Sequence, residues 1–252
     1  KSRIFYNGRF FKYPLDPFNL FVNLGPAESI MMPLSYLRAQ LWPYTEEDTF
    51  DRWVCNRFGR RLYLAFFKTY TEKVWGMPCS RIRSDWAAQR IRDLSFIAAV
   101  IDSLLKIRKP KTLISKFYYP LKGPGMMWER FREAVLNGGG QVLLNSEVTG
   151  VAHEKGHVTG LTFNKDGKTH ETPVSRLVST IPVSRLVHML RPVAPEKVLE
   201  AAGGLSYRAF VIVILIMDQK NLFDDQWIYI HSPRFRVGRI QNFSNWSSAM
   251  SP

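Results

Sequence analysis

The spacing of apolar residues changes once along this chain of 252 residues. From about Glu28 to Leu105 the apolar residues recur at every third or fourth position, which is typical of amphipathic helices. After Gly140 they form short alternating runs, which are typical of strands. Each pattern leaves one apolar face that must be buried against another element. The sequence therefore predicts an α+β fold, with a helical lobe packed beside a mixed, largely antiparallel sheet.

The same change predicts two parts. Residues 1–116 are expected to form a hairpin and a helical substrate lobe, and residues 117–252 a region that contains the sheet. The chain opens with Lys1 and stops at Ser251-Pro252, directly after an aromatic-rich stretch. We therefore expect a piece of a longer protein that is truncated at both ends.

The first part opens with a hairpin signal at Ile4–Phe11, where two aromatic runs flank the pair Asn7-Gly8. Four helices are then predicted from start and stop signals. The first starts at Thr45–Asp48 and stops before Gly59, the second has Leu62, Phe66, Phe67 and Tyr70 on one side and ends at Trp75-Gly76, the third runs from Ser84-Asp85 through Arg92, and the fourth covers Phe96–Ile107.

The second part mixes strands with one helix. Met126–Leu136 reads as a helix that Gly138–Gly140 stops, and Lys122–Gly125 before it reads as a tight loop. The Asp-Gly pair in Asn164–Gly167 predicts a hairpin turn. The predicted strands are Phe117–Pro120, Gln141–Leu144, Glu147–His153, His157–Phe163, Arg176–Ser179, Tyr207–Met217, Trp227–His231 and Val237–Gln241.

Basic residues outnumber acidic ones, with 35 lysines and arginines against 21 aspartates and glutamates, a formal net charge of +14. Such an excess attracts anionic ligands, polyanions or anionic membrane surfaces. The densest basic cluster is Lys106–Lys116. No nucleic-acid-binding motif accompanies it. We therefore expect an anionic small molecule as the partner, no nucleic acid, and peripheral membrane association as an alternative.

The longest apolar run is Ala209–Met217. It is too short to cross a membrane as a helix and is typical of a buried strand. The two cysteines are too few for a disulfide scaffold, which favours a reducing compartment, and we expect a cytoplasmic location. Cys55 lies on an apolar helix face, where core packing is expected, whereas Cys79 follows Pro78 at a helix exit.

Tyr70 and Trp75 lie near the end of the second predicted helix, and Arg90 follows further on. Spacing alone favours core aromatics, because positions i and i+5 do not share a helix face. The segment Leu62–Gly76, however, resembles the UDP-galactopyranose mutases. These belong to a group of FAD-dependent enzymes that includes protoporphyrinogen oxidases, amine oxidases and carotenoid desaturases. The resemblance implies that Tyr70 and Trp75 line a sugar-nucleotide pocket and that Arg90 binds the diphosphate. The spacing from Trp75 is one residue longer than in the mutases, which leaves Arg92 as the alternative.

Three further segments resemble parts of the same superfamily, so that the resemblance covers about residues 1 to 245. Tyr119–Met126 is similar to a stretch that precedes a helix there, and Glu147–Val151 to a strand that meets the adenine end of FAD. Val178–Pro182 is similar to a segment that returns past the cofactor. The cofactor contacts that this resemblance implies are Gly123, Gly125, Met126, Val148, Thr180 and Pro182.

The glycine-rich fingerprint that cradles the pyrophosphate of a dinucleotide is absent from these residues. Gly123–Gly125 lacks the spacing, and Gly138–Gly140 follows a helix where the fingerprint would open one. The resemblance implies that the fingerprint lies nearer the N-terminus of the parent protein. We therefore expect FAD as the cofactor of the full-length parent, with weak or absent FAD binding and no turnover by this fragment.

No side chain is predicted to be catalytic, and none to bind a metal. The acidic residues form no pair typical of general acid–base catalysis, and in flavoenzymes the isoalloxazine ring performs the chemistry. The histidines show no metal-ligand spacing, and each is expected at the surface or in a strand. They are His153, His157, His170, His188 and His231.

Three functions remain open. The first is the substrate-binding portion of a flavoprotein similar to UDP-galactopyranose mutase, an isomerase in which the flavin performs the chemistry. The second keeps the fold but predicts an FAD-dependent oxidase or desaturase of the protoporphyrinogen oxidase or amine oxidase type. The third is a basic domain that docks on a membrane or a partner without catalysis.

Overall fold

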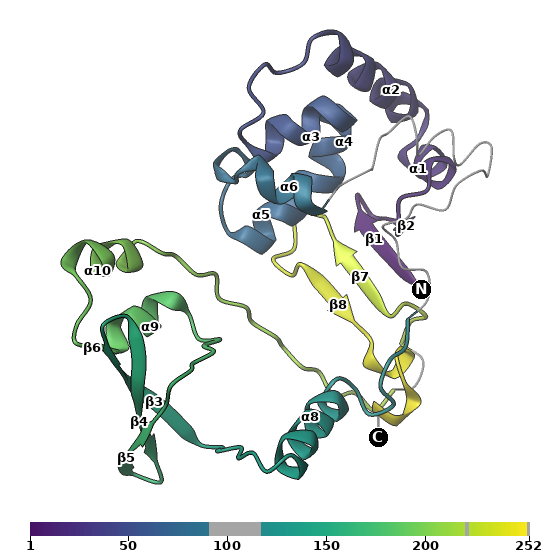
Figure 1. Cartoon of the computed structure of the whole chain (residues 1–252). Helices are drawn as coiled ribbons and strands as arrows, with labels where there is room; N and C mark the ends of the chain where they lie inside the picture. Colours follow the sequence, from purple (N-terminus) through teal and green to yellow (C-terminus); the bar gives the residue numbers. More distant parts are fainter. Residues whose placement is uncertain (91–116, 220–221, 251–252) are drawn as a thin grey trace. The chain divides into compact units, whose positions relative to one another are not determined.

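The structure is a computed structural model that describes residues 1–90, 117–219 and 222–250 (Figure 1). The chain forms two compact units. Unit 1 comprises Lys1–Met127 and Ile214–Pro252, and unit 2 comprises Trp128–Val213. The boundary expected between residues 116 and 117 lies at the edge of a segment outside the described residues, and it stays a prediction. None of the helices in the described ranges combines the length and the apolarity needed to cross a membrane.

A four-stranded sheet forms one layer of unit 1. Its strands are β1 (Ser2–Tyr6), β2 (Arg9–Lys12), β7 (Trp227–Ile230) and β8 (Arg239–Gln241), in the spatial order β2-β1-β7-β8. β1 pairs parallel with β7, and the other two pairs are antiparallel. Asn7 and Gly8 have φ angles of 47° and 75°, as a type I′ turn requires. The predicted hairpin is therefore confirmed.

Short helices form the second layer of unit 1 (Figure 1). In chain order they are α1 (Pro17–Leu24), α2 (Pro26–Leu41), α3 (Phe50–Phe58), α4 (Arg60–Leu62), the π-helix η1 (Tyr63–Lys68), α5 (Thr69–Trp75), the 3-10 helix η2 (Cys79–Arg81) and α6 (Ser84–Arg90). Gly76 caps α5 in the left-handed conformation, with φ 67°, as the sequence predicted. Two short 3-10 turns, η3 (Phe243–Asn245) and η4 (Ser248–Met250), follow β8.

The first predicted helix start is wrong. α3 begins at Phe50, with Thr49 in the extended N-cap position, whereas Thr45–Asp48 is not helical. Glu47 is held outside the helix because its carboxylate accepts hydrogen bonds from Asn56 at 2.8 Å and Arg57 at 2.7 Å. The third helix does start at Ser84 and is described to Arg90. Arg92, the fourth helix at Phe96–Ile107 and the basic cluster Lys106–Lys116 lie outside the described residues.

The core of unit 1 lies between the helices and one face of the sheet. Ile4 and Phe11 reach it from the hairpin, and it also contains Cys55 and Cys79. The core position expected for Cys55 is therefore confirmed. The other main members come from the helical layer and are Leu20, Met32, Phe50, Trp53, Val54, Phe58, Leu62, Tyr63, Ala65, Phe66, Ile82 and Ala87.

Unit 2 contains a second four-stranded sheet and two helices of its own. Its strands are β3 (Ser146–Glu154), β4 (His157–Lys165), β5 (Lys168–Pro173) and β6 (Leu190–Arg191), in the order β5-β4-β3-β6. The antiparallel pairs β3–β4 and β4–β5 form a meander, and β6 adds a parallel edge. The helices are α9 (Val183–Met189) and α10 (Glu196–Gly203). Asp166 and Gly167 have φ angles of 50° and 75°, which confirms the predicted turn.

The helix α8 (Gly125–Asn137) leads from unit 1 into unit 2, and the glycines after it end it as predicted. The tight turn before it is also confirmed, because the Gly123 amide donates to the Pro120 carbonyl at 2.9 Å. In the sheets, β3, β4, β7 and β8 confirm the strands expected there. The α+β fold with a mixed sheet beside a helical lobe is confirmed.

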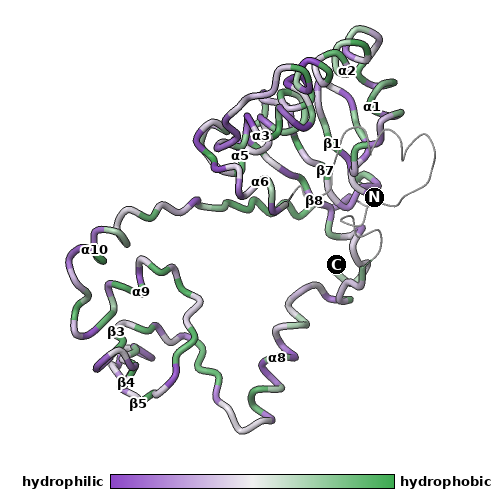
Figure 2. Tube along the Cα trace, turned by 45° about the horizontal axis from the view of Figure 1, so that its top comes forward, coloured by the Kyte–Doolittle hydropathy of each residue, from purple (hydrophilic) through white to green (hydrophobic). Residues whose placement is uncertain are grey.

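Four predicted strands do not form: the structure shows no strand at these residues, and none of the described strands pairs with them. They are Phe117–Pro120, Gln141–Leu144, Arg176–Ser179 and Tyr207–Met217. The rings of Phe117 and Tyr119 instead pack at a tilt against the ring of Trp246. Figure 2 shows the last of the four as a continuous hydrophobic tract. Side chains Phe210–Ile216 are between 67% and 90% exposed.

Candidate functional site

Tyr70, the first of the predicted ligand contacts, lies against the end of β7. Its ring stacks flat on the imidazole of His231, with centroids 5.1 Å apart and an interplanar angle of 10°. The ring of Tyr229 meets it edge-on at 5.2 Å. A methyl group added at Gly238 would lie 3.9 Å from the Tyr70 ring. The half-buried Tyr70 therefore has neighbours on several sides and a defined orientation.

The π-helix η1 determines which neighbours the aromatics before Tyr70 meet. Phe66 packs into the core against Phe11, with ring centroids 5.1 Å apart. Phe67 stacks instead on Phe58 of α3, at 5.3 Å. Phe66 is a member of the core of unit 1 and Phe67 packs against the same core, so the expected common side of these aromatics stays a prediction. A π-helical turn holds more residues than an α-helical one, which changes the spacing on which that prediction rested.

Two more tyrosines and an arginine lie beside Tyr70. The rings of Tyr13 and Tyr229 are 4.9 Å apart. Burial, then the Tyr229 phenol and its hydrogen bond, raise the pKa of Tyr13 to about 12. Burial also raises the pKa of Tyr70, while the nearby guanidinium of Arg239 acts in the opposite direction. The phenols of Tyr13 and Tyr70 therefore stay protonated at neutral pH.

Arg239 is paired in register with Tyr229 across β7 and β8. Its side chain is exposed, and no carboxylate pairs with it among the residues that the structure describes. Lys73 differs, because its ammonium donates to the carbonyls of Ile230 and Ser232, at 2.8 and 2.7 Å, and to Val237. Lys73 thus fixes the β7–β8 connection, whereas Arg239 can pair with an anion.

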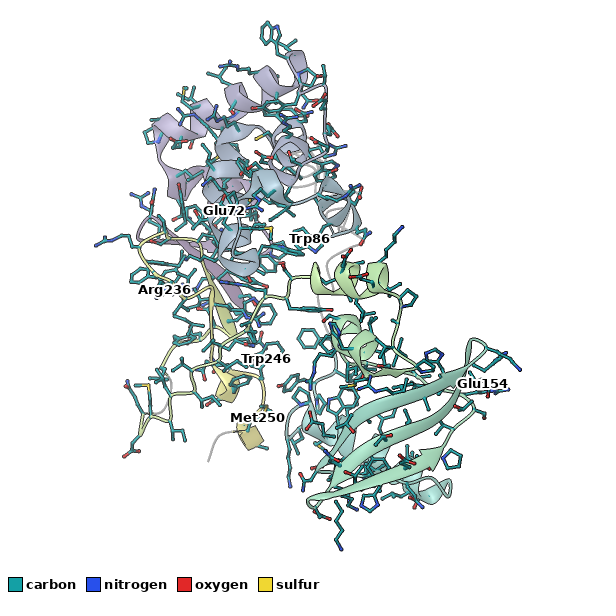
Figure 3. All side chains as sticks on the ribbon, turned by 90° about the vertical axis from the view of Figure 1, so that its left-hand side faces the viewer. Glu72, Trp86, Glu154, Arg236, Trp246 and Met250 are labelled. Atoms are coloured by element: carbon teal, nitrogen blue, oxygen red, sulfur yellow. The ribbon has the colours of Figure 1, made fainter. Side chains whose placement is uncertain are left out.

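Trp75 lies in a different environment from Tyr70. Its ring meets Trp86 of α6 edge-on at 5.2 Å, and both pack against the core of unit 1 (Figure 3). Its indole Nε1 is buried and has no hydrogen-bond partner in the described part of the chain. The ring contacts of Tyr70 and Trp75 have no residue in common. The structure therefore does not place the two aromatics in contact.

Arg90 is the last residue of α6, one helical turn after Trp86. Trp75 therefore packs against the helix that carries Arg90. The role of Arg90 stays a prediction, as does that of the alternative Arg92, which lies outside the described residues.

A model of the family described as flavin containing amine oxidoreductase matches residues 45–245. The chain belongs to this family. The predicted superfamily is therefore confirmed, and so is the expected cofactor of the parent protein, FAD.

Among solved structures, the chain is similar to a crystal structure of reduced UDP-galactopyranose mutase. The two share 17% sequence identity with a TM-score of 0.74, over all of this chain and 54% of the mutase chain. At this identity the likeness shows a common fold. The present chain spans about half the length of that mutase chain.

The residues that are predicted to contact FAD are distributed over both units of the chain. Gly123 has φ 85°, and a methyl group added to it would meet the Met250 side chain at 3.0 Å. Gly125 begins α8 with open space around it. The sulfur of Met126 accepts a hydrogen bond from the Lys122 amide at 3.1 Å. These three residues therefore form a turn and a helix start in unit 1.

The remaining predicted contacts lie in unit 2. Val148 adjoins an irregularity in β3, Thr180 is exposed, and Pro182 is the N-cap residue of α9. None of the described residues forms the strand, glycine-rich loop and helix that would cradle a pyrophosphate. The six FAD contacts therefore stay predictions.

Sequence reasoning missed Tyr13, Tyr229 and Arg239, and it gave His231 the wrong environment. His231 was expected at the surface or in a strand, but it follows β7 and is buried. Tyr13, Tyr229, Arg239 and His231 each lie in or next to a strand that the sequence predicted correctly. The parallel pairing of β1 with β7, which brings these distant segments together, has no local sequence signal.

Within the described residues, no cluster of histidines, cysteines and carboxylates is able to hold a metal ion. Burial raises the pKa of Cys55 and of Cys79 to about 11. The thiolate is the reactive form of cysteine, so both side chains are unreactive at neutral pH.

Proposed function

We propose that this chain is the substrate-binding part of an FAD-dependent mutase that acts on a nucleotide sugar. The observation that carries the proposal is the placement of Tyr70 beside Arg239. An oriented aromatic ring and a guanidinium without a carboxylate partner, within the described residues, lie on one side of the unit 1 sheet.

The chemistry of these groups suits a nucleoside diphosphate ester. A flat aromatic surface packs against a base or a sugar. The planar fork of a guanidinium pairs with two phosphate oxygens at once. The hydroxyls of Tyr13 and Tyr229 lie beside Tyr70 and are groups that can form hydrogen bonds with sugar or phosphate oxygens. Arg90, on α6, is proposed as a second diphosphate contact.

When bound, FAD supplies the redox and nucleophilic chemistry. The residues of this chain would bind the diphosphate and orient the sugar. The described side chains around Tyr70 are phenols, an imidazole and cations, with no carboxylate among them. This composition favours binding and orientation over proton transfer by an acidic pair.

The proposal predicts that Arg239→Gln weakens UDP binding by the flavin-loaded full-length protein. Loss of a charged hydrogen bond costs about 1.5–3 kcal/mol, a fall in affinity of roughly 10- to 100-fold. The matched control is Arg236→Gln, which removes the same charge from the exposed loop before β8 (Figure 3). Isothermal titration calorimetry measures both. Equal, small effects of the two substitutions would contradict the site.

The second candidate is an oxidase or desaturase, which the family match favours because its description names an amine oxidoreductase. It predicts that a porphyrinogen, an amine or a polyene bleaches the flavin without dithionite. Absence of bleaching with all three classes counts against it.

The third candidate, membrane or partner docking without catalysis, depends largely on Lys106–Lys116, which lie outside the described residues. It predicts binding to anionic liposomes without FAD. No binding at low salt would remove it.

A further inference from the structure

His231 is a buried polar residue that needs an explanation. Only 5% of its surface is exposed, although it follows directly after β7. Burying a polar side chain costs free energy unless its hydrogen bonds are replaced. His231 also lies outside every group that the sequence singled out as functional.

Three elements fix the position of this residue. Its backbone amide donates to the Phe5 carbonyl of β1 at 2.9 Å. Lys73 of α5 binds the carbonyls on either side of it, at Ile230 and Ser232. The imidazole ring itself packs against the rings of Tyr70 on α5 and of Phe66 in the π-helix η1. The ring therefore has little freedom to move.

The imidazole is held in one protonation state. Nδ1 is buried and has no hydrogen-bond partner among the described residues. Burial and the Lys73 ammonium lower the pKa of His231 to about 4. The other titratable groups that face it are the phenols of Tyr70 on α5 and Tyr229 on β7. From η1 and β1 it meets the Phe66 ring and the Phe5 backbone.

The fixed ring covers one face of Tyr70. The interplanar angle of 10° is that of a flat stack, whereas Tyr229 meets Tyr70 at 85°. A ring held from two directions loses little further freedom when a ligand packs on it, which lowers the entropic cost of binding. His231 thus holds the Tyr70 ring in its orientation without itself contacting the ligand.

We propose that His231 is a positioning residue, which orients the Tyr70 ring for ligand binding by stacking on it while backbone contacts to β1 and Lys73 hold His231 in place. The inference rests on the proposed function, because it requires Tyr70 to contact the ligand.

The test compares UDP affinity and thermal stability in the flavin-loaded full-length protein. His231→Gln keeps a hydrogen-bond donor but removes the flat ring. His231→Phe keeps a flat aromatic ring but removes the two ring nitrogens. An aromatic pair contributes about 0.5–1.5 kcal/mol, so we expect His231→Gln to weaken UDP binding roughly 2- to 10-fold. His231→Phe should bind within about twofold of the wild type even if it melts at a lower temperature. A purely structural role would make affinity follow stability.

A double-mutant cycle with Tyr70→Leu shows whether His231 acts through Tyr70. In the Tyr70→Leu background, His231→Gln should have no further effect on UDP affinity. The matched control is His170→Gln, which removes a stacked imidazole from Phe163 in unit 2 and should leave UDP affinity unchanged.

The outcomes separate the inference from the proposed function. If Tyr70→Leu leaves UDP affinity intact, both fall. If Tyr70→Leu weakens binding but His231→Gln does not, or weakens it equally in both backgrounds, only the inference is overturned. If His231→Gln does not fold, the UDP affinity of the folded His231→Phe variant is the deciding measurement. A loss of UDP affinity of more than about tenfold in His231→Phe would reject the positioning role.

Discussion

At the scale of a single residue, His231 connects the sheet of unit 1 with its helical layer. Its backbone follows directly after β7, its ring packs against Phe66 of η1, and the same ring stacks on Tyr70. The spacing of histidines along a sequence indicates metal sites, which need several ligands. It cannot indicate this arrangement, in which a single imidazole stacks on a tyrosine. The flat stack depends on tertiary contacts between segments that lie far apart in the sequence.

The lowered pKa of His231 predicts how stability depends on pH. The folded state keeps the imidazole neutral down to about pH 4, whereas the unfolded chain binds a proton below about pH 6.5. The free energy of unfolding should therefore fall as the pH drops from 6.5 to 4, by up to about 1.4 kcal/mol per pH unit. Urea unfolding of the wild type and of His231→Phe measures this contribution as a difference in slope.

The control for that experiment is His157→Gln, which removes an exposed imidazole from β4 and should keep the wild-type slope. Identical slopes for the wild type and His231→Phe would show that His231 titrates normally.

Local signals predicted individual elements well where the cause is local. The turn at Asn7-Gly8 and the stop at Gly76 follow from backbone conformations that the sequence specifies. The start of α3 was misplaced because the Glu47 carboxylate accepts hydrogen bonds from Asn56 and Arg57. These contacts hold Glu47 outside the helix and override the local capping pattern. Similarly, no propensity distinguishes the π-helix η1 from an ordinary helical turn.

The junction of α3 and α4 yields a prediction at the scale of elements. Gly59 has φ 80°, and a methyl group added there would lie 2.8 Å from the backbone nitrogen of Tyr36 in α2. Gly59→Ala must therefore displace α2 as well as adopt an unfavourable φ. We expect a loss of at least about 2 kcal/mol in the free energy of unfolding.

Gly156→Ala is the matched control for Gly59→Ala. Gly156 has nearly the same φ, 82°, but nothing lies within 4 Å of the added methyl group. Chemical denaturation should show a cost near 1 kcal/mol, which is that of the left-handed conformation alone. Equal losses for the two variants would mean that α2 does not approach Gly59 closely in solution.

At the scale of the whole molecule, the largest difference from the sequence prediction is the tract Tyr207–Met217. Its composition is that of a buried strand, yet the structure shows it exposed and without a partner strand among the described residues (Figure 2). Periodicity identifies a segment that is able to pair, but it does not supply the neighbour. The sequence indicated neither the parallel pairing of β1 with β7 nor the lack of a partner for this tract among the described residues.

An exposed apolar segment with high strand propensity favours intermolecular pairing. We expect Ile214→Lys to lower light scattering by concentrated solutions of the 252-residue chain several-fold, without lowering its melting temperature. The buried control, Val151→Lys in β3, should unfold unit 2. If Ile214→Lys is as destabilising as Val151→Lys, the tract is buried in solution.

The π-helix η1 has a consequence for how this gene can change. A π-helical turn accommodates one extra residue in a helix, so a single-codon deletion between Tyr63 and Lys68 can restore α-helical winding while Tyr70 and Trp75 keep their directions. Insertions and deletions in homologues should therefore concentrate at this turn. An alignment that forbids a gap there would pair Tyr70 with the wrong column.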